Sequence, residues 1–150
     1  MTDNTSTASF AWSGPGIIQS FITIPKDSKL SEETLEKWLD NVYVPALIDT
    51  GIVKSAWRYK AANPHSDKPL MYIYKIPELR DVQAGKLQDI KRTSDLFPAD
   101  GPLEDFVISE SRILGLVQLY ETTKQPEGPF KTGHVLQLLQ MLDTTSCSIF

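Results

Sequence analysis

The candidates for moving a proton in this 150-residue sequence are Asp40, Tyr43, His65 and His134. No metal-ligand spacing, phosphate-binding loop, dinucleotide-binding glycine pattern, nucleophile elbow or paired-carboxylate motif is present. We therefore expect a site that uses no metal and no cofactor. Such a site needs one proton donor or acceptor beside an apolar substrate, because general acid–base catalysis contributes about 10²–10⁴-fold to a rate.

Three of these residues are predicted to be catalytic. Tyr43 is predicted to be the acid or base, and Asp40, three residues earlier, has the spacing that orients a neighbour on a helix. His65 lies in a turn-rich loop that we place at the mouth of the site, because imidazole titrates near neutral pH. The alternatives are structural: Tyr43 completes the buried face of a helix, Asp40 is solvated, and His65 and His134 are surface histidines.

Six residues of the expected strands are predicted to bind the substrate. They are Gln19, Phe21, Trp57, Tyr59, Tyr72 and Tyr74. Large aromatic rings with a polar tip suit a small apolar or aromatic metabolite. Gln19 interrupts an apolar strand, and a buried amide requires a partner that a ligand can supply. Core packing is the alternative for the aromatic residues, and for Arg58 the alternatives are a substrate carboxylate or a solvated face toward Asp or Glu.

Four segments rich in β-branched and aromatic residues predict strands. They are residues 16–24, 52–60, 70–76 and 106–122. The second and third are separated by a turn-rich loop and are expected to form a hairpin. The fourth is expected to bend at Gly115, since glycine inside a strand favours a bulge or bend.

Two segments have the three-to-four spacing of apolar residues that is typical of helices. The first follows Ser31, a good N-cap, and stops at Gly51, which readily adopts the left-handed conformation. Pro45 is expected to kink this helix or end it early, because proline lacks a backbone donor. The second predicted helix covers residues 81–96 and is weakened by Gly85.

The order strand, helix, strand, strand, helix, strand predicts a ferredoxin-like α+β fold, with both helices on one face of an antiparallel sheet. We assign residues 1–14 to a disordered tail, 15–124 to the domain and 125–150 to a C-terminal extension that forms a helix or an added strand. The six predicted substrate-binding residues are expected on the other face of the sheet. Because that face is too apolar to remain in water, we expect a homodimer that packs sheet to sheet.

Residues 30–60 read LSEETLEKWLDNVYVPALIDTGIVKSAWRYK and resemble the signature region of EthD-like proteins. Trp38 matches the tryptophan of the family's helix, Pro45 its proline and Gly51 its turn glycine. Arg58 and Tyr59 match the arginine–tyrosine pair at the end of the strand that follows. The resemblance extends over about residues 16–122 and implies a dimeric α/β barrel.

The resemblance also implies a function in fungal secondary metabolism. EthD-like proteins with assigned roles include cofactor-independent lyases, dehydratases, decarboxylases and cyclases that act on aromatic or polyketide-derived metabolites. Many relatives carry a histidine where this chain has Tyr43, so Tyr43 would have to replace it. Two alternatives remain open, namely a non-catalytic protein that binds or chaperones a biosynthetic intermediate and a cofactor-free monooxygenase.

Composition limits the other partners. The net charge is −4, from 15 Lys and Arg against 19 Asp and Glu, and no basic cluster predicts nucleic-acid binding. No secretory signal or long apolar run is present, and the lone Cys147 suits a reducing compartment, so we expect a cytoplasmic protein. Residues 147–150, CSIF, fit a prenylation motif, so a membrane partner is expected only if Cys147 is prenylated.

Overall fold

The computed structural model describes residues 11–121, 134–135 and 139–141. The strands are β1 Gly16–Thr23, β2 Ser55–Lys60, β3 Leu70–Ile76, β4 Ile108–Leu116, β5 Tyr120–Glu121, β6 His134–Val135 and β7 Leu139–Met141. The helices are α1 Glu32–Trp38, the π-helical turn η1 Leu39–Tyr43, α2 Val44–Asp49, α3 Leu79–Gln83 and the 3-10 turn η2 Leu103–Asp105. Cys147 and most of the expected tail and C-terminal extension lie outside the described residues.

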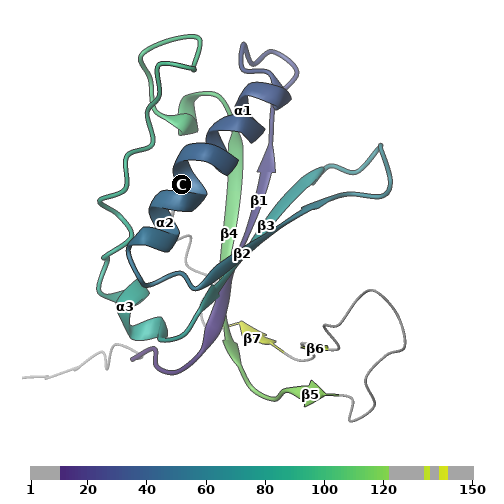
Figure 1. Cartoon of the computed structure of the whole chain (residues 1–150). Coiled ribbons are helices and arrows are strands. Elements are labelled where there is room, and N and C mark those ends of the chain that lie inside the picture. Colours follow the sequence, from purple (N-terminus) through teal and green to yellow (C-terminus); the bar gives the residue numbers. More distant parts are fainter. Residues whose placement is uncertain (1–10, 122–133, 136–138, 142–150) are drawn as a thin grey trace, which may run out of the picture.

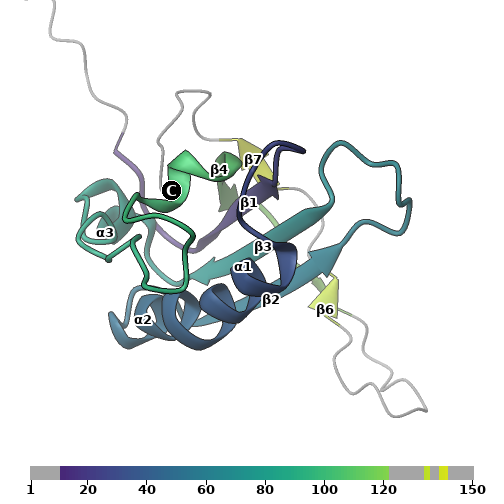
Figure 2. The same ribbon diagram turned by 90° about the horizontal axis from the view of Figure 1, so that it is seen from above.

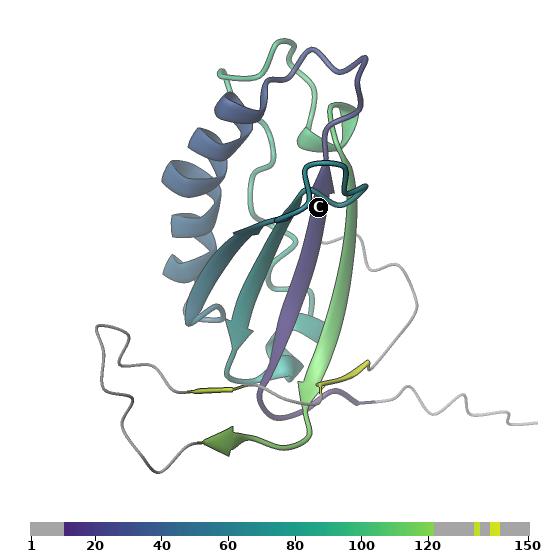
Figure 3. The ribbon, with the colours of Figure 1, turned by 90° about the vertical axis from the view of Figure 1, so that its right-hand side faces the viewer.

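The main sheet has the strand order β2-β3-β1-β4-β7, and every neighbouring pair is antiparallel. The order of its first four strands is compatible with a ferredoxin-like fold, so the predicted α+β class and the hairpin of β2 and β3 are confirmed. The helices lie on one face of this sheet (Figures 1 and 2). Seen from the side, no helix of the described chain covers the opposite face, which we call the open face (Figure 3).

The first predicted helix forms, with an irregular turn in its middle. Ser31 accepts a hydrogen bond from the Thr34 backbone, and Gly51 has the left-handed φ of 76°. Just before Pro45, the Val44 N–H bonds to the Leu39 carbonyl, five residues back rather than four. The wider turn is the form that the predicted kink takes, since proline crowds the preceding turn and donates no hydrogen bond.

This π-helical turn changes which residues face the sheet. In a regular helix, Val42 and Tyr43, three and four residues after Leu39, would both lie near the buried stripe. The extra residue of η1 instead turns Val42 out, where it is 49% exposed, and turns Tyr43 and Leu47 into the core. The same turn carries Asp40 at the edge of the sheet.

The prediction of a second helix over residues 81–96 is wrong for most of that range. Only α3 is helical, and Gly85, with a φ of 77°, ends the regular backbone. Val82 and Leu87 are nevertheless buried, whereas Leu96 is 55% exposed. The irregular segment 84–107 also places Phe97 and Leu103 in the core. Periodicity therefore identified a buried segment and not its backbone conformation.

The long fourth strand is interrupted later than expected. Gly115 stays in the ladder opposite Gly16, and β4 ends at Leu116 before the short strand β5. The two paired glycines let β1 and β4 lie close, because a Cβ on Gly16 would overlap the Leu114 carbonyl oxygen and the Leu79 side chain. Of the two forms expected for the C-terminal segment, the added strand is found, since β7 pairs with β4.

The register decides which aromatic residues belong to the core. Gln19, Phe21, Trp57 and Tyr59 lie on the open face, as predicted. Tyr72 and Tyr74 do not: they are buried on the helix face, so their predicted place on the open face is wrong. Successive side chains of a strand point to opposite faces. Tyr72 is paired with Arg58 and Tyr74 with Ala56, and both partners point toward the helices.

Candidate functional site

A polar cluster lies where the π-helical turn meets the edge strand β2. The Asp40 carboxylate accepts hydrogen bonds from two groups on the sheet. Its Oδ1 is 3.2 Å from the Tyr72 hydroxyl, and its Oδ2 is 2.5 Å from Arg58 Nη1. We call these three residues, Asp40, Arg58 and Tyr72, the seam cluster. Asp40 and Arg58 are partly open to solvent, whereas Tyr72 is buried.

The spacing of helix and strand builds this cluster. Acidic residues occur every four positions on one side of the helix, at Glu32, Glu36 and Asp40, while basic residues occur two apart on β2, at Arg58 and Lys60. Lys60 Nζ pairs with Glu32 and Glu36, and Arg58 pairs with Glu36 at 3.6 Å as well as with Asp40. Helical positions i and i+4 share a side, as do strand positions i and i+2, so the two rows align.

The electrostatics of the cluster keep Tyr72 protonated. Burial raises the pKa of the Tyr72 phenol, and the nearby negative charge of Asp40 raises it further. The hydrogen bond with Tyr72, together with Asp40, raises the pKa of the Arg58 guanidinium. At neutral pH the cluster therefore contains a neutral phenol that can donate a proton and a permanently charged arginine beside an accessible carboxylate.

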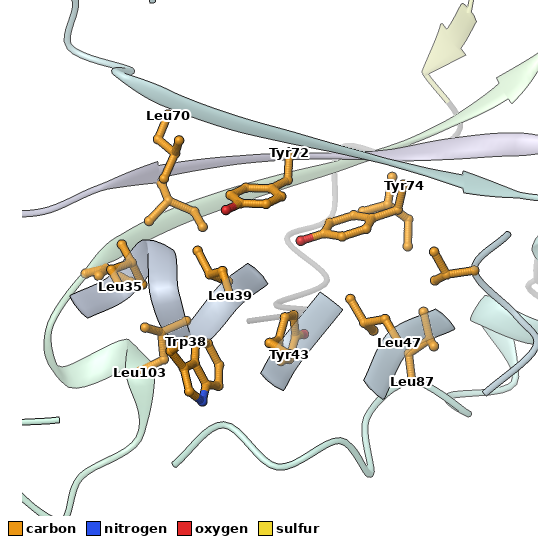
Figure 4. Close-up of a cluster of buried hydrophobic side chains, with 14 of the residues drawn as sticks. Leu35, Trp38, Leu39, Tyr43, Leu47, Leu70, Tyr72, Tyr74, Leu87 and Leu103 are labelled. Atoms are coloured by element: carbon orange, nitrogen blue, oxygen red, sulfur yellow. The ribbon is translucent and has the colours of Figure 1, made fainter. Parts of the chain in front are cut away.

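Tyr74 lies next to this cluster in the interior. Its ring stacks on that of Tyr72, with centroids 6.0 Å apart and planes at 12°. Both rings lie between the sheet and the helix residues Leu39 and Tyr43 (Figure 4). The Tyr74 hydroxyl is buried without a hydrogen-bond partner among the described residues, and burial raises its pKa well above the usual value.

Tyr43, the predicted acid or base, lies deeper in the core. Its ring stacks on Trp38 at 5.0 Å and is 1% exposed. Burial raises the pKa of the Tyr43 phenol to about 12, and Arg92, which is ion-paired with Glu104 on the far side of the helix, opposes this shift. The structure places Asp40 against Tyr72 and Arg58, on the side of the helix that faces β2.

Tyr43 gives a prediction about stability at high pH. Its pKa is higher in the folded chain, so the unfolded chain loses the proton first and the free energy of unfolding falls as pH rises from 10 toward about 12. Below pH 10 this contribution is fully present. We expect urea unfolding of Tyr43→Phe to show a shallower decline than wild type over this range, by about 2–3 kcal/mol in total. Tyr120→Phe, at a half-exposed position, is the control, and an equal decline in wild type and Tyr43→Phe would contradict the prediction.

The remaining predicted residues lie elsewhere. His65 is exposed in the β2–β3 loop, which projects away from the helices (Figure 1), and the side chain of His134 is outside the described residues. On the open face, the Gln19 amide contacts Met71 Sδ at 3.2 Å, and Phe21 lies beneath Lys68 Nζ at 4.7 Å. Trp57 and Tyr59 are about half exposed on that face, at 42% and 49%.

The structure thus divides the predicted residues between the two faces of the sheet. It brings Asp40 together with Tyr72 and Tyr74, and it places Arg58, which we had not assigned to the site, beside them. The matched four-residue and two-residue spacings of the acidic and basic residues are the signal that could have identified Arg58. Sequence analysis did predict one of its two alternatives, a partly solvated face toward Asp or Glu.

Two surface hollows lie away from the seam cluster. One, of about 280 Å³, is lined by Pro25, Asp27, Ser28, Lys29, Asp105 and Phe106. The other, of about 110 Å³, is lined by Ile22, Ile24, Glu32, Leu35, Pro69 and Leu70. Within the described ranges, no three His, Cys, Asp or Glu residues are grouped so that they could hold a metal ion. No helix in that part of the chain is long and apolar enough to span a membrane.

Comparison with known proteins finds one distant similarity of interest. The chain is 28% identical over 88 residues to "Core atranone cluster (CAC) protein 1" of Stachybotrys chlorohalonatus (strain IBT 40285). The match covers 59% of this chain and 35% of that protein, so it spans about a third of the relative's length. No described protein family matches the chain, and no solved structure does. The chain is therefore distantly similar to a fungal protein named for the atranone cluster.

Proposed function

We propose that the protein is a cytoplasmic, cofactor-independent tailoring enzyme for a small aromatic or polyketide-derived metabolite. Its reaction belongs to the lyase, dehydratase, decarboxylase or cyclase type. The observation that carries the proposal is the hydrogen bond from the Tyr72 hydroxyl to Asp40, whose carboxylate is also held by Arg58. A base and a neutral acid in contact are the groups that acid–base chemistry requires.

In an elimination of water, Asp40 accepts the proton from the carbon next to a substrate carbonyl. The electrons of that C–H bond form the new double bond while the C–O bond at the neighbouring carbon breaks. Tyr72 gives its proton to the departing hydroxide, which leaves as water. The proton on Asp40 then returns to the Tyr72 phenolate along their hydrogen bond, so both groups recover their starting state. Arg58 holds the carboxylate and stabilises negative charge that develops on the substrate oxygen.

The similarity to a protein named for the atranone cluster supports a role in the biosynthesis of a secondary metabolite. The placement of Asp40 in a π-helical turn also supports it, since such turns are frequent at functional sites. A non-catalytic protein that holds an intermediate is the second candidate, because Tyr43, which would replace the histidine of EthD-like proteins, is buried against Trp38.

The test is turnover without added cofactor, measured both with and without oxygen. Purified protein is incubated with a panel of aromatic polyketide ketones and β-hydroxy ketones. The products are separated, and their masses are measured by mass spectrometry. Loss of water, loss of carbon dioxide or an isomer of unchanged mass would support the proposal. Saturable binding without a product would support the non-catalytic candidate, and a product that requires oxygen would indicate a monooxygenase.

We further propose that the protein is a homodimer that buries the open face. Each of the strands β1 to β4 contributes an apolar side chain to this face, namely Phe21, Trp57, Ile73 and Leu114. Trp57 is 42% exposed and Tyr59 is 49% exposed on this face, and exposed aromatic side chains are enriched in contacts between proteins. A second copy of the chain presents the same apolar surface, which is what an isologous contact requires.

Replacing Trp57 with lysine should separate the dimer without unfolding the chain. The charge would lie within the proposed interface, on the edge strand β2, but it would remain in water in the monomer. We expect light scattering to show a shift from twice the chain mass to the chain mass, with an unchanged circular dichroism spectrum. Val42→Lys, at an equally exposed position on the helix side, is the control. A wild-type protein that is already a monomer would contradict the proposal.

A further inference from the structure

The Tyr74 hydroxyl is a polar group that the structure leaves without a partner. The side chain is 2% exposed, and its hydroxyl forms no hydrogen bond with any described residue. An unpaired buried hydroxyl destabilises a protein, whereas replacing it with hydrogen does not. Phenylalanine would fill the same space in the core at lower cost. The hydroxyl therefore calls for an explanation outside folding.

The Tyr74 ring adjoins the seam cluster. Its ring is stacked on Tyr72, whose hydroxyl is bonded to Asp40, and Asp40 is partly exposed at the edge of the sheet. Tyr74 stays neutral, because burial and the nearby Tyr43, Tyr72 and Asp40 all raise its pKa. It can therefore act as a hydrogen-bond donor at every physiological pH.

We propose that Tyr74 is a substrate-binding residue, whose hydroxyl donates its hydrogen bond to a carbonyl or phenol oxygen of a planar substrate that lies against the stacked tyrosines. The inference rests on the proposed function and narrows its substrate class to flat molecules that carry such an oxygen. Substrate oxygen supplies the missing partner, so the cost of the buried hydroxyl is recovered when the ligand binds. A site built to bond a substrate oxygen also rejects analogues that lack it.

The test is a double-mutant cycle of binding affinities, in which the hydroxyl is removed from the protein and the oxygen is removed from the probe, separately and together. The probes are 1-naphthol and naphthalene, and the proteins are wild type, Tyr74→Phe and the control Tyr120→Phe, whose side chain is 47% exposed in β5. We expect Tyr74→Phe to weaken 1-naphthol binding by about fivefold to tenfold and to leave naphthalene binding unchanged. Tyr120→Phe should change neither affinity. The unliganded Tyr74→Phe protein should melt at the same temperature as wild type or higher.

Several results would overturn the inference. Three of them concern binding: an equal loss of affinity for both probes in Tyr74→Phe, no loss of affinity for either probe, or no saturable binding of either probe. The fourth is a lower melting temperature of unliganded Tyr74→Phe, which would mean that the hydroxyl has a partner in the free protein. The outcomes also separate this inference from the proposed function. Binding of 1-naphthol that depends on Tyr74, in a protein without turnover, would support the inference and reject the enzyme.

Discussion

Replacing Asp40 with asparagine is expected to lower turnover by about two to four orders of magnitude, because it removes the proposed proton acceptor. The amide has nearly the same shape and can still accept a hydrogen bond from Tyr72. Asp40 is partly solvated, and ion pairs at such positions contribute only about 0–1 kcal/mol to stability. Folding should therefore be preserved, and the loss should appear in kcat when turnover is measured on a substrate found in the cofactor-free screen.

Glu36→Gln is the matched control for this change. Glu36 lies one helical turn before Asp40 and also pairs with Arg58, but the Tyr72 hydroxyl is bonded to Asp40. The control removes the same charge from the same row of acidic residues and should keep turnover within a few-fold of wild type. Similar losses of turnover in both variants would mean that turnover depends on the combined negative charge of the acidic residues and that Asp40 is not the base. Full activity in Asp40→Asn would reject the proposed mechanism.

Replacing Trp38 with alanine should cause the largest loss of stability, about 3–5 kcal/mol, because it leaves a cavity in the centre of the core. The indole is fully buried and packs on Tyr43 and on Phe97, with ring centroids 5.0 and 5.1 Å apart. It connects the helix to the irregular segment 84–107, which has few backbone hydrogen bonds to support it. We expect a decrease of about 10 °C or more in the melting temperature, measured by calorimetry.

Trp38→Phe separates the packing of the ring from its polar atom. The indole Nε1 is buried without a hydrogen-bond partner among the described residues, so its removal should cost nothing. The phenyl ring should recover most of the contacts, and the loss should be well below that of the alanine variant. If both variants are equally unstable, the indole N–H has a bonding role that the structure does not show. If Trp38→Ala is as stable as wild type, the core described above is wrong.

Local patterns in the sequence were sufficient to predict the helix and strands that have clear boundaries. Ser31, Gly51 and Pro45 marked the start, the end and the irregular turn of the first helix, since each acts through its own backbone or its near neighbours. The alternation of β2 correctly separated Trp57 from Arg58, because successive strand residues always point to opposite faces. The element order then limited the fold to one sheet with helices on one face.

Other features depended on contacts between distant segments. Segment 84–107 buries Leu87, Phe97 and Leu103 although Gly85 interrupts the predicted helix, and Phe97 packs against Trp38. With the extra residue in η1, Tyr43 is in the core and Val42 is turned out, whereas the helical period alone places both near the buried side.

The candidate site shows the same division. Asp40, Tyr72 and Tyr74 were recognised from the sequence by residue type, together with Tyr43, but the pairing of Asp40 was assigned to its neighbour on the helix. Residue types and spacings determined that this chain has an amphipathic helix over an antiparallel sheet and a set of tyrosines near a carboxylate. The tertiary structure alone decided that Asp40 bonds Tyr72 and Arg58, because the faces of β2 and β3 depend on their register, and register is set by the packing of the whole sheet.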